Sequence, residues 1–133
     1  MIKGITFGVF DIFHMGHLNM LERAKERCDY LIVGVHDDKL NIKGAKFLYS
    51  LEDRIKFVSS IKFVDEVFVY ERVDISIGVK DFNVFIRGPD QAHQYFQKAF
   101  EYCTLNNREI ITLERTDNIS SSMFRSVLLT KDI

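Results

Sequence analysis

The sequence predicts an α/β protein built on one parallel sheet of five strands, with helices covering both faces. Three observations support this prediction. Short apolar runs alternate with segments of helical periodicity along the chain. The apolar runs are continuous, as in strands that are buried on both faces, and 133 residues suit one domain with one core. Such alternation requires right-handed crossovers, and ligands of such sheets bind beyond the carboxyl ends of the strands.

The first half of the chain shows three of the strands. They are predicted at residues 2–10, 30–35 and 66–70, where the sequence is apolar and rich in β-branched and aromatic side chains. Helical spacing of apolar residues separates them at 18–28 and 51–61. Residues 11–17 form the loop between the first strand and the first helix, and residues 37–50 form a long basic loop.

The second half repeats the pattern. A short helix is predicted at residues 75–80, a strand at 84–86, a helix at 91–105, a strand at 109–113 and a last helix after residue 120. No repeat, low-complexity tract or linker interrupts the chain. We therefore expect a single domain over residues 1–133.

Charge and composition exclude several classes of function. The 18 basic and 19 acidic residues leave a net charge of −1, so no global field attracts nucleic acid or anionic lipid, and neither is an expected partner. Cys28 and Cys103 lie in apolar helical patterns without metal-type spacing, which predicts reduced core thiols. No apolar stretch is long enough to span a bilayer and no leader pattern is present. We expect a cytoplasmic protein.

The loop at residues 10–17 is the first candidate site. It stands where a strand passes into a helix, so backbone N–H groups and the positive end of the helix dipole favour a phosphate there. His14 and His17 flank Gly16, whose missing side chain permits close approach of a ligand. The alternatives are an ordinary first turn that happens to hold two histidines, or half of a zinc site. A zinc site needs further ligands, and His36 and His93 lie in unrelated segments, so no metal site is expected.

A second candidate anion site follows the fifth strand. Residues 115–122 read R-T-D-N-I-S-S-S and precede a predicted helix, which combines a guanidinium, several hydroxyls and a second helix N-terminus. The alternative is a plain helix cap formed by Ser120 or Ser121, with Arg115 in solvent.

These segments resemble a known family. Residues 8–17, G-V-F-D-I-F-H-M-G-H, resemble the G-x-F-D-x-x-H-x-G-H signature of small cytidylyltransferases, and residues 115–122 resemble their R-T-x-G-I-S-T-T signature. Arg54 and the V-D-E-V at 64–67 fall where that family has an arginine and the same four residues. The chain thus looks like a member of the cytidylyltransferase-like nucleotidyltransferases, most similar to the bacterial glycerol-3-phosphate cytidylyltransferases. The resemblance implies a Rossmann-like domain of the HxGH type.

The resemblance also implies an activity: transfer of CMP from CTP, bound with Mg²⁺, to a small phosphorylated acceptor, with release of pyrophosphate. The acceptor would be glycerol 3-phosphate or a related polyol phosphate, sugar phosphate or phosphonate. A homodimer and a role in making precursors of cell-surface polysaccharides are implied as well.

Site residues follow from the same resemblance. His14, His17 and Arg115 would be catalytic, and Lys43, Lys46 and Arg54 would bind the acceptor. The nucleotide would be bound by a larger set drawn from both signatures and from the loop after the fourth strand. That set is Gly8, Val9, Phe10, Asp11, His14, Gly16, His17, Gly88, Asp90, Arg115, Thr116, Ile119, Ser120 and Ser121. Asp11 would orient the histidine loop or bind Mg²⁺ through water, although an aspartate there is also an ordinary turn residue.

Departures from the family pattern leave alternatives open. Val9 replaces a threonine, Asn118 replaces a glycine that asparagine can mimic at positive φ, and G-P-D-Q at 88–91 replaces a G-D-D-W-like loop. The last change leaves the acceptor open. An adenylyltransferase and a non-catalytic nucleotide sensor stay as alternatives. A dinucleotide-dependent oxidoreductase is disfavoured, because the first strand is not followed by G-x-G-x-x-G.

Overall fold

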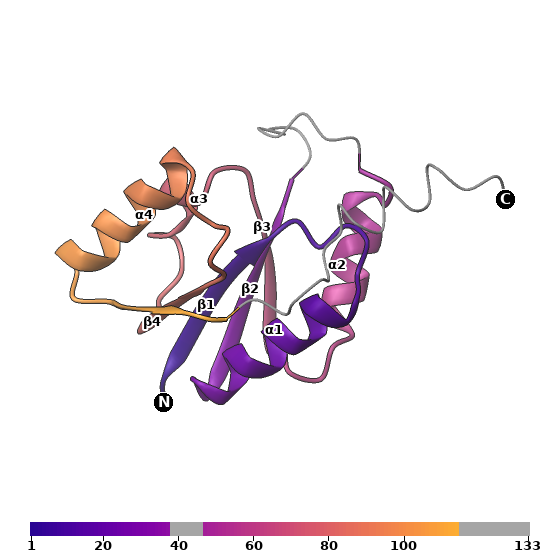
Figure 1. Ribbon diagram of the computed structural model, residues 1–133, viewed down its shortest axis with the longest axis horizontal. Helices are drawn as coiled ribbons and strands as arrows, with labels where there is room; N and C mark the ends of the chain where they lie inside the picture. Colours follow the sequence, from indigo (N-terminus) through magenta and orange to yellow (C-terminus); the bar gives the residue numbers. More distant parts are fainter. Residues whose placement is uncertain (38–46, 115–133) are drawn as a thin grey trace, which may run out of the picture.

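The computed structural model describes residues 1–37 and 47–114, and these form a five-stranded, all-parallel sheet with helices around it (Figure 1). The spatial order of the strands is β3-β2-β1-β4-β5. The strands are β1 (Lys3–Gly8), β2 (Tyr30–His36), β3 (Glu66–Tyr70), β4 (Val84–Arg87) and β5 (Glu109–Thr112). The helices are α1 (Met15–Glu26), α2 (Leu51–Ser59), α3 (Val73–Ser76) and α4 (Gln94–Leu105). The predicted fold class is confirmed.

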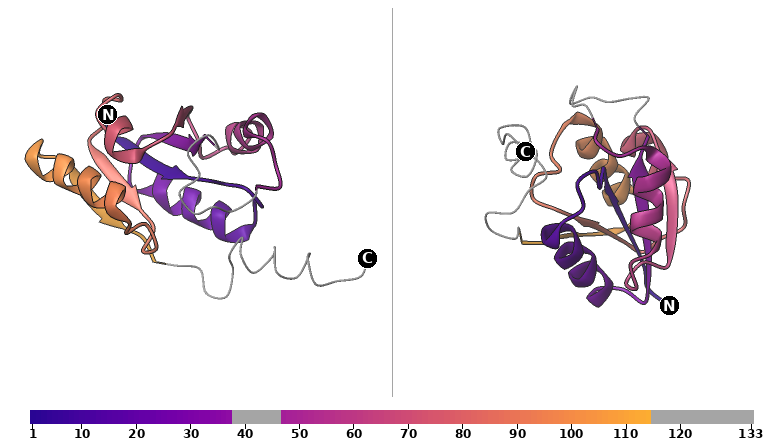
Figure 2. Two further views of the ribbon diagram at one scale, coloured as in Figure 1. Left: turned by 90° about the horizontal axis from the view of Figure 1, so that it is seen from above. Right: turned by 90° about the vertical axis from the view of Figure 1, so that its right-hand side faces the viewer.

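The strand order places α1 and α2 on one face of the sheet and α3 and α4 on the other. The chain runs outward from β1 through β2 to β3, then returns to lay β4 against the free side of β1. Two core clusters reflect this division. One joins Leu21 and Val58 to Val33, and the other joins Phe96 to Phe7. Figure 2 gives two further views of the helices around the sheet.

The direction of winding reverses between β1 and β4, and their pairing there is short. β1 pairs with β2 along its whole length, through Gly8 and Val35, whereas its register with β4 covers only Gly4–Val84 and Ile5–Phe85. Beyond Ile5, β1 and β4 are therefore no longer joined by a ladder of backbone pairing. This is the topological switch point, where open parallel sheets bind ligands at their carboxyl edge.

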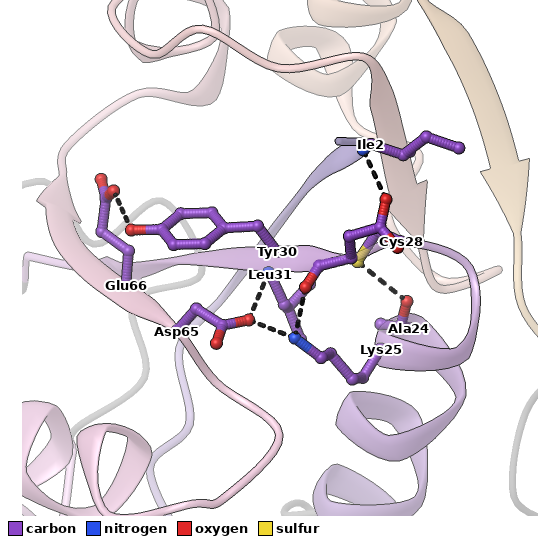
Figure 3. Close-up of polar contacts among 9 residues, drawn as sticks. Ile2, Ala24, Lys25, Cys28, Tyr30, Leu31, Asp65 and Glu66 are labelled. Carbon is purple, nitrogen blue, oxygen red and sulfur yellow. Dashed lines mark hydrogen bonds and ion pairs between the residues drawn. The ribbon is translucent and has the colours of Figure 1, made fainter.

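At the opposite end of the sheet, where β2 and β3 begin, a polar network links α1 to the strands (Figure 3). The Lys25 ammonium, near the end of α1, donates to the Asp29 carbonyl and to the Asp65 carboxylate, which also accepts the Leu31 N–H at 2.8 Å. Tyr30 donates its hydroxyl to Glu66 at 2.9 Å. Burial acts to raise the pKa of Asp65, but the Lys25 and Leu31 hydrogen bonds hold that pKa below its usual value. The network fastens α1 to the segment that leads into β3.

Element boundaries differ from the sequence prediction by one to four residues at several places. β1 ends at Gly8, because Phe10 takes a positive φ of 54°. α1 begins at Met15 rather than residue 18, α3 spans Val73–Ser76 rather than 75–80, and α4 begins at Gln94 rather than 91. The helix expected after residue 120 lies outside the described residues.

Both cysteines are free thiols; Cys103 is buried and Cys28 is half-buried. Within the described residues, no helix is both long and apolar enough to cross a membrane.

Candidate active site

Phe10 shapes the start of the loop after β1. Its left-handed backbone, unusual for an aromatic residue, turns its ring back over Gly8, and the ring is only 3% exposed. A Cβ added to Gly8 would lie 2.8 Å from the Phe10 ring, so only glycine fits without displacing it. The ring centroid lies 5.5 Å from that of His17. In this structure Gly8 and Phe10 therefore serve the shape of the loop, and their predicted contact with a nucleotide stays a prediction.

His14 and His17 cap the first turn of α1. His14 is the N-cap residue, and its Nδ1 accepts the Gly16 N–H at 3.0 Å. His17, three residues on, accepts the His14 N–H on its own Nδ1 at 3.2 Å. This is a reciprocal capping box made from two imidazoles instead of a hydroxyl and a carboxylate. The rings stack with their centroids 4.0 Å apart and Gly16 between them in sequence.

The caps determine where each imidazole carries its proton. A nitrogen that accepts a hydrogen bond from a backbone N–H is unprotonated, so in each ring the proton belongs on Nε2. Burial lowers the pKa of His14, and burial with the neighbouring His14 lowers the pKa of His17 to about 3. Both rings are thus neutral at pH 7. Each has one N–H donor, at Nε2, beside the positive end of a helix dipole.

Asp11 binds backbone on the far side of the loop. Its carboxylate is 2% exposed and accepts the Leu48 N–H at 2.8 Å and the Tyr49 N–H at 2.8 Å. The side chain therefore holds the segment just before α2 against the histidine loop. These contacts are of the kind that the expected orientation of the histidine loop by Asp11 requires, while its other expected role, binding Mg²⁺ through water, stays a prediction.

Arg54, on α2, is buried completely, with 0% of its surface exposed. Its guanidinium donates to the carbonyls of His36 at 2.7 Å, Val9 at 3.1 Å and Tyr49 at 3.2 Å. The Phe47 ring lies over it, 4.7 Å away. Arg54 thus joins the carboxyl ends of β1 and β2 to the segment before α2. Its expected contact with an acceptor stays a prediction, and Val9 takes part in this arrangement through its carbonyl oxygen.

The turn after β4 lies across the switch point from the histidine loop. Arg87 donates to the Gly88 carbonyl at 3.3 Å and lies 4.6 Å from the Phe100 ring. Gln91 accepts the Gly88 N–H and donates its own amide N–H to the Phe7 carbonyl on β1. Asp90 is exposed at the tip of the turn. Gly88 and Asp90 were expected at the nucleotide site from the sequence, but Gln91 was not. Its signal was its place in the G-P-D-Q segment, which departs from the family pattern.

A pocket lies further along the same edge, at the carboxyl ends of β2 and β3 and the start of α4. Arg72 forms a two-point ion pair with Asp74, at 3.1 and 2.7 Å, and lies 4.2 Å from the Tyr95 ring. These residues had no role predicted from the sequence, because they belong to neither family signature. The lining consists of His36, Tyr70, Glu71, Arg72, Val73, His93, Tyr95 and Phe96.

Several predicted residues lie outside the described part of the chain. They are Lys43, Lys46, Arg115, Thr116, Ile119, Ser120 and Ser121. Among residues 1–37 and 47–114, no group of three or more His, Cys, Asp or Glu side chains is arranged to hold a metal ion.

Comparison with known proteins adds independent evidence. Residues 5–127 match the family model described as cytidylyltransferase-like. The chain is 40% identical, over 129 residues, to a glycerol-3-phosphate cytidylyltransferase of Bacillus spizizenii, an alignment that covers 94% of this chain and 95% of the relative. An FAD synthase of Thermococcus sibiricus is 41% identical over 95 residues, covering 68% of this chain and 64% of that enzyme. The crystal structure of a lipopolysaccharide core biosynthesis protein from Thermoplasma volcanium superimposes with a TM-score of 0.74 at 26% identity, covering 88% of this chain and 99% of that one.

Proposed function

This chain belongs to the cytidylyltransferase-like family, and from that premise we propose that it transfers CMP from CTP to a small phosphorylated acceptor and releases pyrophosphate. The observation that carries the proposal is the pair of neutral imidazoles at the start of α1, each with an Nε2 donor beside a helix N-terminus. Such a pair suits a phosphate group that gains negative charge during a reaction.

The chemistry needs positioning more than a protein nucleophile. An oxygen of the acceptor phosphate attacks the α-phosphorus of CTP in line, a new P–O bond forms, and pyrophosphate leaves with the electrons of the broken bond. A phosphomonoester has a second pKa of about 6, so at neutral pH it is already largely dianionic and no base has to remove a proton. The lowered pKa of His17 keeps that ring neutral, and the hydrogen bond accepted by its Nδ1 keeps the N–H donor at Nε2. The histidines then stabilise charge as it develops on the phosphate oxygens.

Positive charge for the triphosphate is proposed to come from other segments, since both histidines are neutral. On the family resemblance, Arg115, Thr116, Ser120 and Ser121 bind the β- and γ-phosphates, and Lys43 and Lys46 bind the acceptor phosphate. Ile119, from the same signature, would line the nucleotide site. The backbone at Gly8–Asp11, Gly16, Gly88 and Asp90 completes the proposed nucleotide site.

Mg²⁺ is proposed to enter with CTP. The described residues suit a metal that stays on the phosphate oxygens, because both oxygens of the Asp11 carboxylate accept backbone N–H groups and Mg²⁺ commonly keeps substrate phosphates as its main ligands. When bound, the ion neutralises part of the triphosphate charge.

The pocket at β2 and β3 has room for about one or two water molecules and does not itself identify the acceptor. The cation at its edge, Arg72, is already paired with Asp74 and is therefore a poor partner for a second anionic group. We propose glycerol 3-phosphate as the acceptor on the similarity to a glycerol-3-phosphate cytidylyltransferase over nearly the whole chain.

A pyrophosphate-release screen tests the proposal. It should cross CTP and ATP with glycerol 3-phosphate, other polyol phosphates, sugar phosphates and phosphonates, with Mg²⁺ present. We expect CTP with glycerol 3-phosphate to give the highest kcat/KM. Preference for ATP would establish the adenylyltransferase alternative, for which the partial similarity to FAD synthase is weak support. Nucleotide binding without pyrophosphate release would establish the sensor.

The remaining parts of the proposal concern the whole protein. We propose one catalytic domain over residues 1–133, a homodimer, a cytoplasmic location and a product that serves as a precursor of cell-surface polysaccharide. Light scattering of the purified chain tests the dimer, and fractionation of cells tests the location.

A further inference from the structure

The Gln91 side chain links β1 to the turn after β4, beyond the point where the pairing of β1 with β4 ends. The ladder between β1 and β4 stops at Ile5 and Phe85, and the Phe7 carbonyl lies two residues further along β1. The Gln91 amide donates to that carbonyl. The same amide accepts the Gly88 N–H at 3.4 Å with its oxygen. One side chain thus links the end of β1 to the turn that follows β4.

A second side chain, that of Arg87, links the same turn to α4. Arg87 donates to the carbonyls of Gly88, at 3.3 Å, and of Pro89, at 3.4 Å, and stacks on Phe100. The turn is therefore fixed on α4 by Arg87 and on β1 by Gln91. Of these two contacts, the Gln91 link is the one that crosses the switch point, and it ties the turn to β1 close to Gly8 and the histidine loop.

We propose that Gln91 is a positioning residue that sets the spacing between the loop after β1 and the turn after β4, between which the nucleotide binds. The inference rests on the proposed function. A base held between these two segments is recognised only if their spacing is fixed. Loss of the link widens the range of spacings without removing any group that touches the nucleotide. Nucleotide affinity and discrimination between bases should fall, while the reacting groups at His14 and His17 stay in place.

Two substitutions and a matched control test the inference. Gln91→Met keeps the length of the side chain and removes both hydrogen bonds, and Gln91→Asn keeps the amide but is one bond too short to span the gap. Gln97→Met is the control, because the Gln97 amide also donates to a backbone carbonyl, that of Ala92, but from the exposed side of α4. Each variant is measured for melting temperature, kcat, the KM for CTP, the KM for the acceptor, and the ratio of kcat/KM for CTP over ATP.

We expect both Gln91 variants to raise the KM for CTP about five- to tenfold, as the loss of one or two hydrogen bonds implies. We expect them to lower the CTP-to-ATP ratio at least threefold, while the acceptor KM and kcat at saturation change less than twofold. Gln97→Met should match the wild type. A lower melting temperature with CTP KM and base ratio unchanged would overturn the inference, and so would no change at all.

The design separates this inference from the proposed function. If the wild type releases no pyrophosphate with any acceptor, the proposed activity fails, and calorimetric titration of CTP and ATP replaces the kinetic constants. Weaker and less selective binding by the Gln91 variants would then still support the role of Gln91. Equal binding by wild type and variants, or no binding by the wild type, would overturn it.

Discussion

Replacement of His17 by asparagine separates its two roles. In the structure Nδ1 of His17 accepts the His14 N–H and completes the helix cap, while Nε2 is the expected donor to phosphate. The Oδ1 atom of an asparagine lies close to the position of Nδ1 and can keep the cap. It provides nothing at the position of Nε2. His17→Ala, in contrast, removes both functions.

The two roles differ in size. A donor that acts on developing charge contributes about 2.7 to 4 kcal/mol to the transition state, which is a factor of about 10² to 10³ in kcat. A capping hydrogen bond contributes about 1 kcal/mol to folding. We therefore expect His17→Asn and His17→Ala to lose similar amounts of kcat. Only the alanine variant should lose about 1 kcal/mol of unfolding free energy.

The pH dependence of stability gives an independent check. The pKa of His17 falls from 6.5 to about 3 on folding, so between these values the unfolded chain binds a proton that the folded chain does not. Folding stability therefore falls as the pH drops below 6.5, at a rate of at most about 1.4 kcal/mol per pH unit. Because His17 keeps some exposure, we expect about 1 kcal/mol of extra loss at pH 5.5 in the wild type. His17→Asn should lack this loss.

Pyrophosphate-release kinetics at pH 7.5 and urea unfolding at pH 7.5 and 5.5 provide the measurements. The reasoning is refuted if His17→Asn keeps more than about a tenth of the wild-type kcat. The assignment of the pH dependence to His17 is refuted if the wild type and His17→Asn lose the same unfolding free energy between pH 7.5 and 5.5.

Three further predictions concern the scaffold and are read by urea unfolding. Gly8→Ala should cost about 1 to 3 kcal/mol, because its Cβ meets the Phe10 ring at 2.8 Å, whereas Gly88→Ala, with no atom within 4 Å, should cost much less; equal costs would contradict the packing argument. Asp65→Asn should cost less than about 1 kcal/mol at pH 7, since the pair with Lys25 is partly exposed, and the cost should shrink below pH 4 as Asp65 protonates; a cost that persists would assign it to packing. Thr6→Val should add about 1 kcal/mol, because the buried Thr6 hydroxyl has no hydrogen-bond partner among the described residues; a loss of stability would mean that the hydroxyl is satisfied.

The strands were predictable because each is buried and continuously apolar, and all five were found within a few residues of their expected positions. The start of α1 was not, since capping residues are normally Ser, Thr, Asp or Asn and a histidine gives no such signal. The positive φ of Phe10 was equally hidden, because aromatic residues rarely adopt it. Phe57, an apolar residue within the segment of helical periodicity at 51–61, is 41% exposed, and its ring lies 5.2 Å from that of Tyr49.

The histidine pair was predictable as a site, but its protonation state was not, because that depends on which backbone groups the rings accept. The burial of Arg54 was hidden for a related reason. A charged residue on an amphipathic helix is normally exposed, and only the folded chain brings three carbonyls to one guanidinium. Gln91 likewise has a partner 84 positions away in sequence.

Arg54 and Asp11 bind main-chain atoms of the residues around them. Their partners are the carbonyls of Val9, His36 and Tyr49 and the amides of Leu48 and Tyr49. Such contacts persist whichever side chains stand at those positions, proline at an amide donor excepted. Side chains at those positions can therefore change over generations while the spacing of the loops is inherited unchanged. The geometry of the site is thus insulated from much of the sequence drift around it.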